Sequence, residues 1–298
     1  MSKANVGDRA VVDGFLLGMP KCGTTWLANI LAQNSSIDFS DPKEPNIIAS
    51  HRGTFGRDAG EPDLEAYGKV FSGSGFRVDG SVHTFSCPLS PSRVYAVNPK
   101  ARFVICLREP VGRAFSHWKM VRDGRADRRN GVDWSDFEIA WGDQRLKDDS
   151  MWSDSMSRWL EKFKIESFLL IDSERMRGKP EEVLGEVTSH FGLPRYDYDF
   201  KATREANTSR SRRGMTHLGS VFREVVRLIP QSIRGSLARP LQKRSLNIYD
   251  LPLISKRGES STLTEEYYRM CAKEVVPDME KFEAITGFHT QHWLDLFR

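Results

Sequence analysis

The stretch Phe15-Leu16-Leu17-Gly18-Met19-Pro20-Lys21-Cys22-Gly23-Thr24-Thr25-Trp26-Leu27 decides the fold and points to a ligand. It begins as a short apolar strand, passes through a glycine-bearing loop and leads into a helix. Strand, loop and helix N-terminus together form an anion site, because unpaired backbone N–H groups and the helix dipole point at one spot. Lys21 adds a positive charge, and Thr24 and Thr25 add hydroxyl donors. The pattern predicts a bound phosphate.

This loop differs from a nucleotide P-loop of the Walker A type. That motif places its lysine directly after the second glycine and follows it with Ser or Thr. Gly18 and Gly23 have the required spacing, but the lysine comes early, at Lys21, and Thr24 stands in its usual place. The loop can therefore bind a phosphate without the usual arrangement for magnesium and a triphosphate.

Residues 102–110 predict a buried strand that runs into a helix. Residues 103–107 are a continuous apolar run, typical of a parallel strand covered on both faces, and Pro110 suits the first helical position. A magnesium-dependent NTPase would need an Asp at the end of such a strand. This chain has Arg108, which binds an anion and cannot hold a metal. Ser116, about two turns into the helix, can donate a hydroxyl to the same anion.

Both stretches resemble the nucleotide motifs of sulfotransferases that use 3′-phosphoadenosine 5′-phosphosulfate (PAPS). Residues 20–27 are similar to the family's 5′-phosphosulfate loop, and residues 108–116 are similar to its 3′-phosphate motif. The order and separation of the motifs match, and residues 159–176 and 191–194 resemble later landmarks of the family. Lys43-Glu44-Pro45 after the first helix is closest to the bacterial and heparan-sulfate-type carbohydrate branch.

The resemblance implies a role for each motif residue. Lys21 would stabilise the charge that grows on the bridging oxygen of the leaving phosphate, and Arg108 and Ser116 would hold the 3′-phosphate. Residues that would bind the 5′ side of the cofactor are Pro20, Lys21, Cys22, Gly23, Thr24, Thr25 and Trp26. The protein would mainly position groups and stabilise charge during in-line transfer of the sulfuryl group. No metal is expected.

A base must take the proton of the acceptor, and the sequence offers two candidates. Glu44 stands where the heparan-type branch places its catalytic glutamate, which implies a carbohydrate or glycan hydroxyl as acceptor. His83 lies where cytosolic small-molecule sulfotransferases keep a catalytic histidine, which implies a lipid or phenolic hydroxyl. Gly80 occupies the position of a lysine in the heparan-type branch, so one expected contact is lost. Trp152 is expected in the core, as most tryptophans are, or, as the resemblance implies, in the wall of the acceptor cleft. A P-loop kinase or NTPase is the third alternative.

Alternating strand and helix patterns predict an α/β fold, with a doubly wound parallel sheet flanked by helices and a P-loop-like nucleotide-binding core. The expected strands are 11–17, 76–81, 102–107 and 167–172, and the expected helices are 24–33, 91–98, 150–163 and 180–191. Residues 35–75 and 123–136 are expected to be loops, and the first of these to carry function. Ligands bind such sheets at the carboxyl ends of their strands. We expect a single domain over residues 1–298.

Residues 204–247 form a basic segment with apolar residues at helical spacing. Between 204 and 244 it holds ten Lys and Arg against two acids. One interpretation is a solvated amphipathic helix that packs on the domain. In the other, Arg210, Arg212 and Arg213 clamp the phosphates of the cofactor as a lid, and the remainder contacts a membrane surface or an anionic acceptor.

Composition is that of an ordinary globular protein. The chain has 298 residues, 39% hydrophobic and 28% charged, and a net charge of +4. This charge suits anionic ligands, but no nucleic-acid motif accompanies it, so no nucleic acid is expected as partner. Neither an apolar run of about 18 residues nor a secretory signal is visible. The four cysteines lack metal or disulfide spacing, which predicts a reducing, cytoplasmic location.

Overall fold

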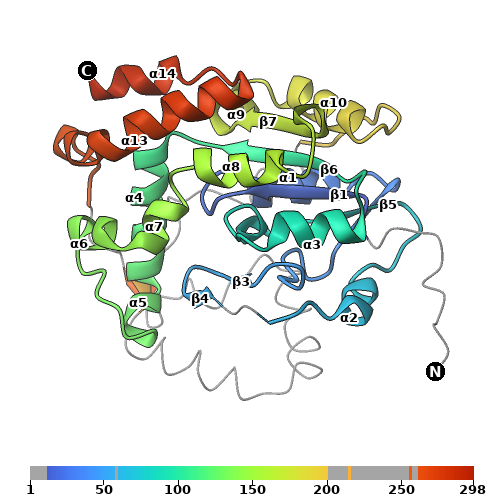
Figure 1. Ribbon diagram of the computed structural model, residues 1–298, viewed down its shortest axis with the longest axis horizontal. Helices are drawn as coiled ribbons and strands as arrows, with labels where there is room; N and C mark the ends of the chain where they lie inside the picture. The colour runs from blue at the N-terminus through green and yellow to red at the C-terminus, as the bar shows by residue number, and fades with distance from the viewer. Residues whose placement is uncertain (1–11, 58–59, 201–213, 216–254, 257–260) are drawn as a thin grey trace.

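A parallel sheet of five strands, in the order β2-β5-β1-β6-β7, forms the centre of the molecule (Figure 1). The computed structural model describes residues 12–57, 60–200, 214–215, 255–256 and 261–298. The strands of this sheet are β1 (Gly14–Gly18), β2 (Ile37–Phe39), β5 (Phe76–Asp79), β6 (Arg102–Leu107) and β7 (Phe168–Asp172). All four neighbouring pairs are parallel, which confirms the predicted sheet.

Aromatic rings fill the core around β6. The Phe103 ring stacks between Phe15 of β1 and Phe168 of β7, with centroid distances of 5.7 and 4.7 Å. Trp159 and Phe163 meet it edge-on at 5.0 and 4.7 Å. Residues 103–107 are all buried. This is why the strand has an uninterrupted apolar sequence instead of an alternating one.

The chain reverses its direction across the sheet at β1. From β1 it passes through α1 (Thr24–Leu31) to the edge strand β2 and returns to β5 beside β1, whereas β6 and β7 add on the opposite side of β1. The connection that leaves β1 therefore runs toward one edge of the sheet, and the connection that leaves β6 runs toward the other edge. In open α/β sheets this switch point is where ligands bind, and both predicted phosphate motifs follow these two strands.

Helices cover both faces of the sheet. Those close to their predicted ranges are α1, α3 (Ser90–Val97), α8 (Ser153–Leu160) and α10 (Pro180–His190). The helix predicted to begin at Pro110 is α4 (Pro110–Asp123). The shorter helices are η1 (Val82–Thr84), α6 (Phe137–Gly142), α7 (Gln144–Asp148), η2 (Ile165–Ser167), α9 (Ser173–Gly178), α14 (Gln291–Leu294) and η6 (Asp295–Phe297).

Two predicted loops contain regular structure. Residues 35–75 include β2, the small antiparallel pair β3 (His51–Arg52) and β4 (Gly56–Arg57), and α2 (Leu64–Lys69). Residues 123–136 include α5 (Ala126–Arg129). These elements are short and stabilised by tertiary or capping contacts: β2 pairs with β5, and the Asp63 side chain caps α2 by accepting from Ala66 N at 2.9 Å. Hydrophobic periodicity cannot detect elements of this length.

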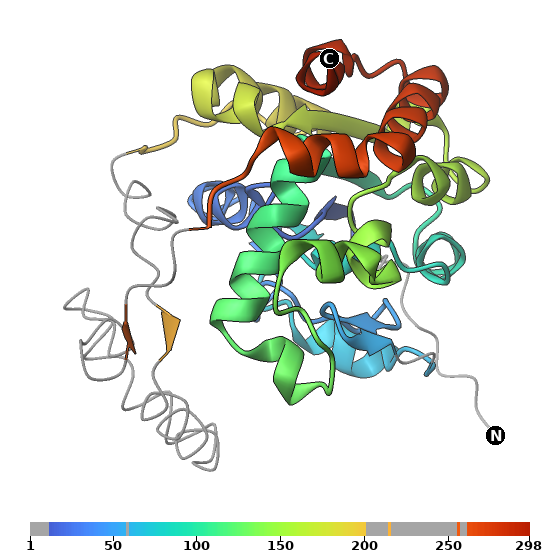
Figure 2. The same cartoon turned by 90° about the vertical axis from the view of Figure 1, so that its left-hand side faces the viewer.

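The long helix α13 (Glu265–Thr286) packs across α4 and α8 (Figure 2). The Glu274 carboxylate accepts from Trp141 Nε1 at 2.8 Å and from Lys147 Nζ at 2.6 Å. Asp278 accepts from the backbone N of Trp152 at 2.7 Å. The sequence carried a signal for this helix, because Cys271, Val275, Met279 and Phe282 are its buried residues and recur at helical spacing.

The predictions for residues 204–247 fall almost wholly outside the described residues. Arg210, Arg212 and Arg213 belong to this part, so their role as a lid stays a prediction. Two-residue strands β8 (Gly214–Met215) and β9 (Ser255–Lys256) pair antiparallel. Within the ranges that the structure describes, no helix has both the length and the apolar character needed to cross a membrane.

Candidate active site

The phosphate loop, residues 19–23, leaves the carboxyl end of β1 and enters α1. Lys21 and Gly23 have positive φ angles of 82° and 91°, a left-handed conformation that residues with a side chain rarely adopt. Gly23 is the N-cap of α1, and no described side chain caps this helix. The first N–H groups of α1 are therefore available to an anion.

Two arginines hold the carbonyl groups of this loop. Arg113 donates to the Pro20 carbonyl at 3.2 Å, and Arg108 donates to the Lys21 carbonyl at 3.4 Å. Arg108 follows β6, which lies beside β1 in the sheet, and Arg113 lies in α4. The two predicted phosphate motifs are thus in direct contact.

Glu109 fixes the start of α4 beside Arg108. Its carboxylate accepts from the backbone N–H groups of Val111 and Gly112, both at 2.6 Å, and from Tyr268 Oη at 3.0 Å. Burial raises the pKa of Glu109, and these hydrogen bonds act in the opposite direction. The Glu109 carboxylate therefore caps the start of α4.

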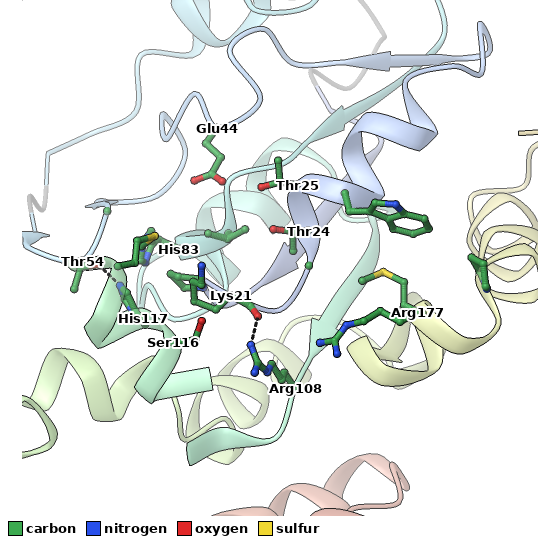
Figure 3. Close-up of a pocket in the computed structure, with 18 residues that line it drawn as sticks. Lys21, Thr24, Thr25, Glu44, Thr54, His83, Arg108, Ser116, His117 and Arg177 are labelled. Atoms are coloured by element: carbon green, nitrogen blue, oxygen red, sulfur yellow. Dashed lines mark hydrogen bonds between the residues drawn. The ribbon is translucent and has the colours of Figure 1, made fainter. Parts of the chain in front are cut away.

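A cavity of about 870 Å³ lies at the carboxyl ends of β1, β5 and β6, within the range of ligand-binding clefts. Its walls are formed by Pro20, Lys21, Gly23, Thr24, Thr25, Trp26, Glu44, Gly53, Thr54, Val82, His83, Arg108, Ser116, His117, Met120, Met176, Arg177 and Pro180. Figure 3 shows Lys21, Thr24 and Ser116 facing a common space from three segments. The structure therefore brings both phosphate motifs and both candidate bases to one site.

Cys22 is the motif residue that the cavity wall lacks. Its side chain is fully buried in the core, and burial raises the pKa of its thiol to about 11. Its backbone N–H donates to the Met19 carbonyl at 3.2 Å. Cys22 thus fits the loop as a small apolar residue, and the structure gives its side chain no path to a ligand.

Glu44 projects into the cavity from a turn that docks on the end of β5 (Figure 3). The Gly80 N–H donates to the Lys43 carbonyl at 3.2 Å. The Asn46 N–H donates to Ser81 Oγ at 3.0 Å. These bonds place Glu44 opposite the phosphate loop, although the two are far apart in sequence. Glu44 is also the single carboxylate among the described residues that line the cavity.

A buried carboxylate, Asp149, lies behind the histidine side of the cavity. His83 Nδ1 is 3.8 Å from Asp149 Oδ1, and His117 Nδ1 is 3.8 Å from Asp149 Oδ2. Arg57 approaches Asp149 Oδ1 to 4.0 Å, and Arg113 donates to His117 Nδ1 at 3.2 Å if that nitrogen is unprotonated. Two imidazoles and the Arg57 guanidinium therefore surround one carboxylate, and Arg113 contacts one of these imidazoles.

Burial lowers the pKa of both cavity histidines. The pKa of His83 falls although Asp149 and Glu44 oppose the shift. The pKa of His117 falls well below its usual value, through burial first and the Arg113 charge second. Both imidazoles are therefore neutral at physiological pH, which is the form able to accept a proton.

Acidification is expected to destabilise the wild-type protein more than the His117→Gln variant. A histidine whose folded pKa is lowered contributes stability that is present above the unfolded pKa of about 6.5 and is lost as pH falls below it, by up to about 1.4 kcal/mol per pH unit. Glutamine keeps a partner for Thr54, whose Oγ1 lies 2.8 Å from His117 Nε2.

Urea unfolding of both proteins at pH 7.5 and pH 5.5 measures this difference. His289→Gln is the matched control, because the His289 side chain is 91% exposed. Equal losses of stability in the wild type and His117→Gln would contradict the assignment of a buried, neutral His117.

Several residues of the cavity wall were not predicted from the sequence. Thr54 reaches the cavity through the β3–β4 turn, His117 directly follows Ser116 in α4, and Arg177 extends from α9 toward the side of Arg108 (Figure 3). His117 and Arg177 could have been proposed from the sequence, because they directly follow residues 108–116 and 159–176, the stretches that resemble family motifs. Trp152 lies in the core and not in the cleft wall: its ring is fully buried and packs at 5.7 Å against both Phe282 and Trp293.

Carboxylates at the neighbouring strand ends are engaged away from the cavity. Asp79, the last residue of β5, accepts from Tyr67 Oη at 2.5 Å, and Asp172, the last residue of β7, lies 2.8 Å from His292 Nε2. Across the described ranges, no group of three or more His, Cys, Asp or Glu side chains is arranged to hold a metal ion.

Comparisons with known proteins identify the family of this chain. A model of the sulfotransferase domain matches residues 12–216. Mouse heparan sulfate glucosamine 3-O-sulfotransferase 5 is 29% identical over 127 residues, which cover 38% of this chain and 36% of that protein. The bifunctional heparan sulfate N-deacetylase/N-sulfotransferase 1 of Caenorhabditis elegans is 23% identical over 203 residues, 65% of this chain and 24% of that protein. The chain thus spans about a third or less of these relatives.

A solved structure supports the fold over almost the whole chain. The sulfotransferase from Alicyclobacillus acidocaldarius superposes with a TM-score of 0.62 and 18% identity, covering 95% of this chain and 98% of that one. The parallel sheet, the phosphate loop and the domain match lead to one conclusion. The chain belongs to the sulfotransferase-domain family.

Proposed function

We propose that this enzyme transfers the sulfuryl group of PAPS to a hydroxyl group of a carbohydrate or glycan acceptor, with Glu44 as general base. One observation carries the proposal: a single cavity joins the phosphate loop, the Arg108–Ser116 pair and one carboxylate. The first two provide for a ligand with two separate phosphates. The Glu44 carboxylate provides a base that can remove the proton of the acceptor hydroxyl.

The chain's own residues fit the charge of such a donor. Arg108 and Ser116 would hold the 3′-phosphate, and Arg177, at the same side of the cavity, would add a second guanidinium. Thr24 and Thr25, with the N–H groups of α1, would hold the 5′-phosphate. When bound, PAPS supplies the activated sulfuryl group.

During transfer the protein would stabilise charge and move one proton. Glu44 would take the proton of the acceptor hydroxyl as that oxygen bonds to sulfur. Lys21 would stabilise the negative charge left on the phosphate oxygen as its bond to sulfur breaks. Adenosine 3′,5′-bisphosphate is then the second product, so atoms and charges balance without a further reactant.

The acceptor class rests on the relatives. Two are named as heparan sulfate sulfotransferases, and one of these, the 3-O-sulfotransferase, is named for transfer to oxygen. The resemblance of residues 43–45 to the heparan-type branch implies that Glu44 corresponds to its catalytic glutamate. A specific observation also favours the alternative, a small lipid or phenolic hydroxyl with His83 as base. His83 lines the cavity in its neutral form, and Asp149 lies 3.8 Å from its Nδ1, where it would stabilise an imidazolium.

Radiolabelled PAPS, offered with a panel of acceptors, tests the proposed activity. The panel contains desulfated heparan oligosaccharides, neutral glycans, sterols and simple phenols. Label transferred to a glycan supports the proposal. Label transferred only to sterols or phenols supports the small-molecule alternative, and turnover that requires magnesium and ATP would contradict both.

Adenosine 3′,5′-bisphosphate is expected to raise the melting temperature, whereas 5′-AMP raises it much less. A ligand at about 100 times its Kd stabilises the native state by about 2.7 kcal/mol, and 5′-AMP lacks the phosphate assigned to Arg108 and Ser116. Thermal shift measurements on the wild type and Arg108→Ala test this.

The matched control is Lys100→Ala, since Lys100 is an exposed cation just before β6, at the opposite end of that strand from Arg108. Arg108→Ala should remove most of the difference between the two nucleotides, and Lys100→Ala should keep it. Equal shifts from the two nucleotides in the wild type would refute the 3′-phosphate site.

A further inference from the structure

The Lys43 ammonium connects the candidate base to the end of β5. Lys43 Nζ donates to Glu44 Oε1 at 2.9 Å and to the Gly80 carbonyl at 3.0 Å. Among the described residues, no other hydrogen bond reaches the Glu44 carboxylate. One carboxylate oxygen is therefore held, and the second is left for the cavity.

Gly80 makes room for this arrangement. A Cβ atom at Gly80 would lie 2.9 Å from the Lys43 carbonyl oxygen and 3.0 Å from Lys43 Cγ, closer than side chains tolerate. The Lys43 carbonyl is itself fixed, because it accepts from Gly80 N at 3.2 Å and from Ser40 Oγ at 2.9 Å. The lysine stem thus lies against a strand end that has no side chain of its own.

This pair differs from an ordinary surface ion pair. Exposed Lys–Glu pairs contribute little, because solvent screens them and both side chains lose freedom. The Lys69–Glu65 pair is of that kind, with side chains 71% and 83% exposed. The Lys43 side chain is only 23% exposed and has a second, backbone partner. The position of its ammonium is therefore fixed, and the ammonium in turn fixes the position of the Glu44 carboxylate.

We propose that Lys43 is a positioning residue for the general base. Its ammonium holds Oε1 of Glu44, so that Oε2 takes the proton of the acceptor hydroxyl while Lys43 keeps its own protons. The proposal rests on the proposed role of Glu44. Small displacements of a reacting group reduce rates strongly, so the loss of this contact should slow turnover without weakening donor binding.

A double-mutant cycle tests the proposal in the full chain. Lys43→Met keeps the length of the stem beside Gly80 and removes the charge. Alone, it should lower kcat by about 10- to 100-fold, with KM for PAPS and the shift caused by adenosine 3′,5′-bisphosphate unchanged. Added to Glu44→Gln, Lys43→Met should lower kcat further by less than about 2-fold, because the effects of substitutions at residues that act through one another are not additive.

Lys69→Met is the matched control, and it should keep wild-type kinetics. Full additivity of Lys43→Met and Glu44→Gln would overturn the proposal, because Lys43 would then act independently of Glu44. So would wild-type kcat in Lys43→Met. A failure of the base assignment looks different: Glu44→Gln alone would retain near-normal turnover, whatever Lys43→Met does.

Discussion

Lys21→Ala should lower turnover by roughly three orders of magnitude, with a much smaller loss of affinity for the donor. Its charge matters most when negative charge develops on the leaving phosphate, and preorganised groups at such positions have the largest effects in enzymes. Alanine and lysine have the same difficulty with the left-handed backbone at φ +82°, so the substitution isolates the ammonium group.

Single-turnover kinetics and a binding titration with adenosine 3′,5′-bisphosphate separate the two effects. Lys21→Arg is an informative companion, because it retains the charge but not the shape of the ammonium. A loss confined to donor affinity, with a normal rate at saturation, would make Lys21 a binding residue and remove it from the chemical step.

The second large effect is expected from Glu44→Gln, which should lower kcat by about 100-fold or more. Glutamine keeps the size of the side chain and its ability to accept from Lys43, but it is not a base. His83→Asn should cost much less, although His83 lines the same cavity. Steady-state kinetics of the two variants with one acceptor provide the comparison.

The reverse outcome, near-normal activity in Glu44→Gln and collapse in His83→Asn, would transfer the role of base to His83 and favour a small-molecule acceptor. The pH profile separates the two candidates less sharply than the variants do. Burial lowers the pKa of His83, so a histidine base would lose activity only below its usual value of about 6.5.

The phosphate motifs could be predicted because their determinants are local. The strand, the loop glycine and the helix of residues 14–31 follow each other directly, and Arg108 follows an apolar strand that periodicity identifies. Parallel neighbours in one sheet then bring the two ends together, since β1 pairs with β6 over its whole length. For these elements, local sequence patterns are therefore enough to predict which residues lie close together.

The acceptor side could not be predicted in the same way. Glu44 owes its place to bonds between its turn and residues 80–81, more than thirty positions away. Asp149 meets His83 and His117 only after three segments have packed together. Trp152 carries an aromatic ring that suits a sugar, but α13 buries it. Such contacts depend on tertiary packing, which no local pattern records.

The position of α13 has a consequence for how the protein is made. Tyr268 of this helix bonds Glu109 at the start of α4, and Tyr267 packs against Phe115 at 5.7 Å. A ribosome adds about 5–20 residues per second, so α13 emerges roughly 8 to 30 s after α4. Until then Phe115 of α4 can pack against Phe137, at 5.3 Å, but it lacks its contact with Tyr267. The contacts that α13 makes with the start and the apolar face of α4 are therefore among the last that the chain can form during synthesis.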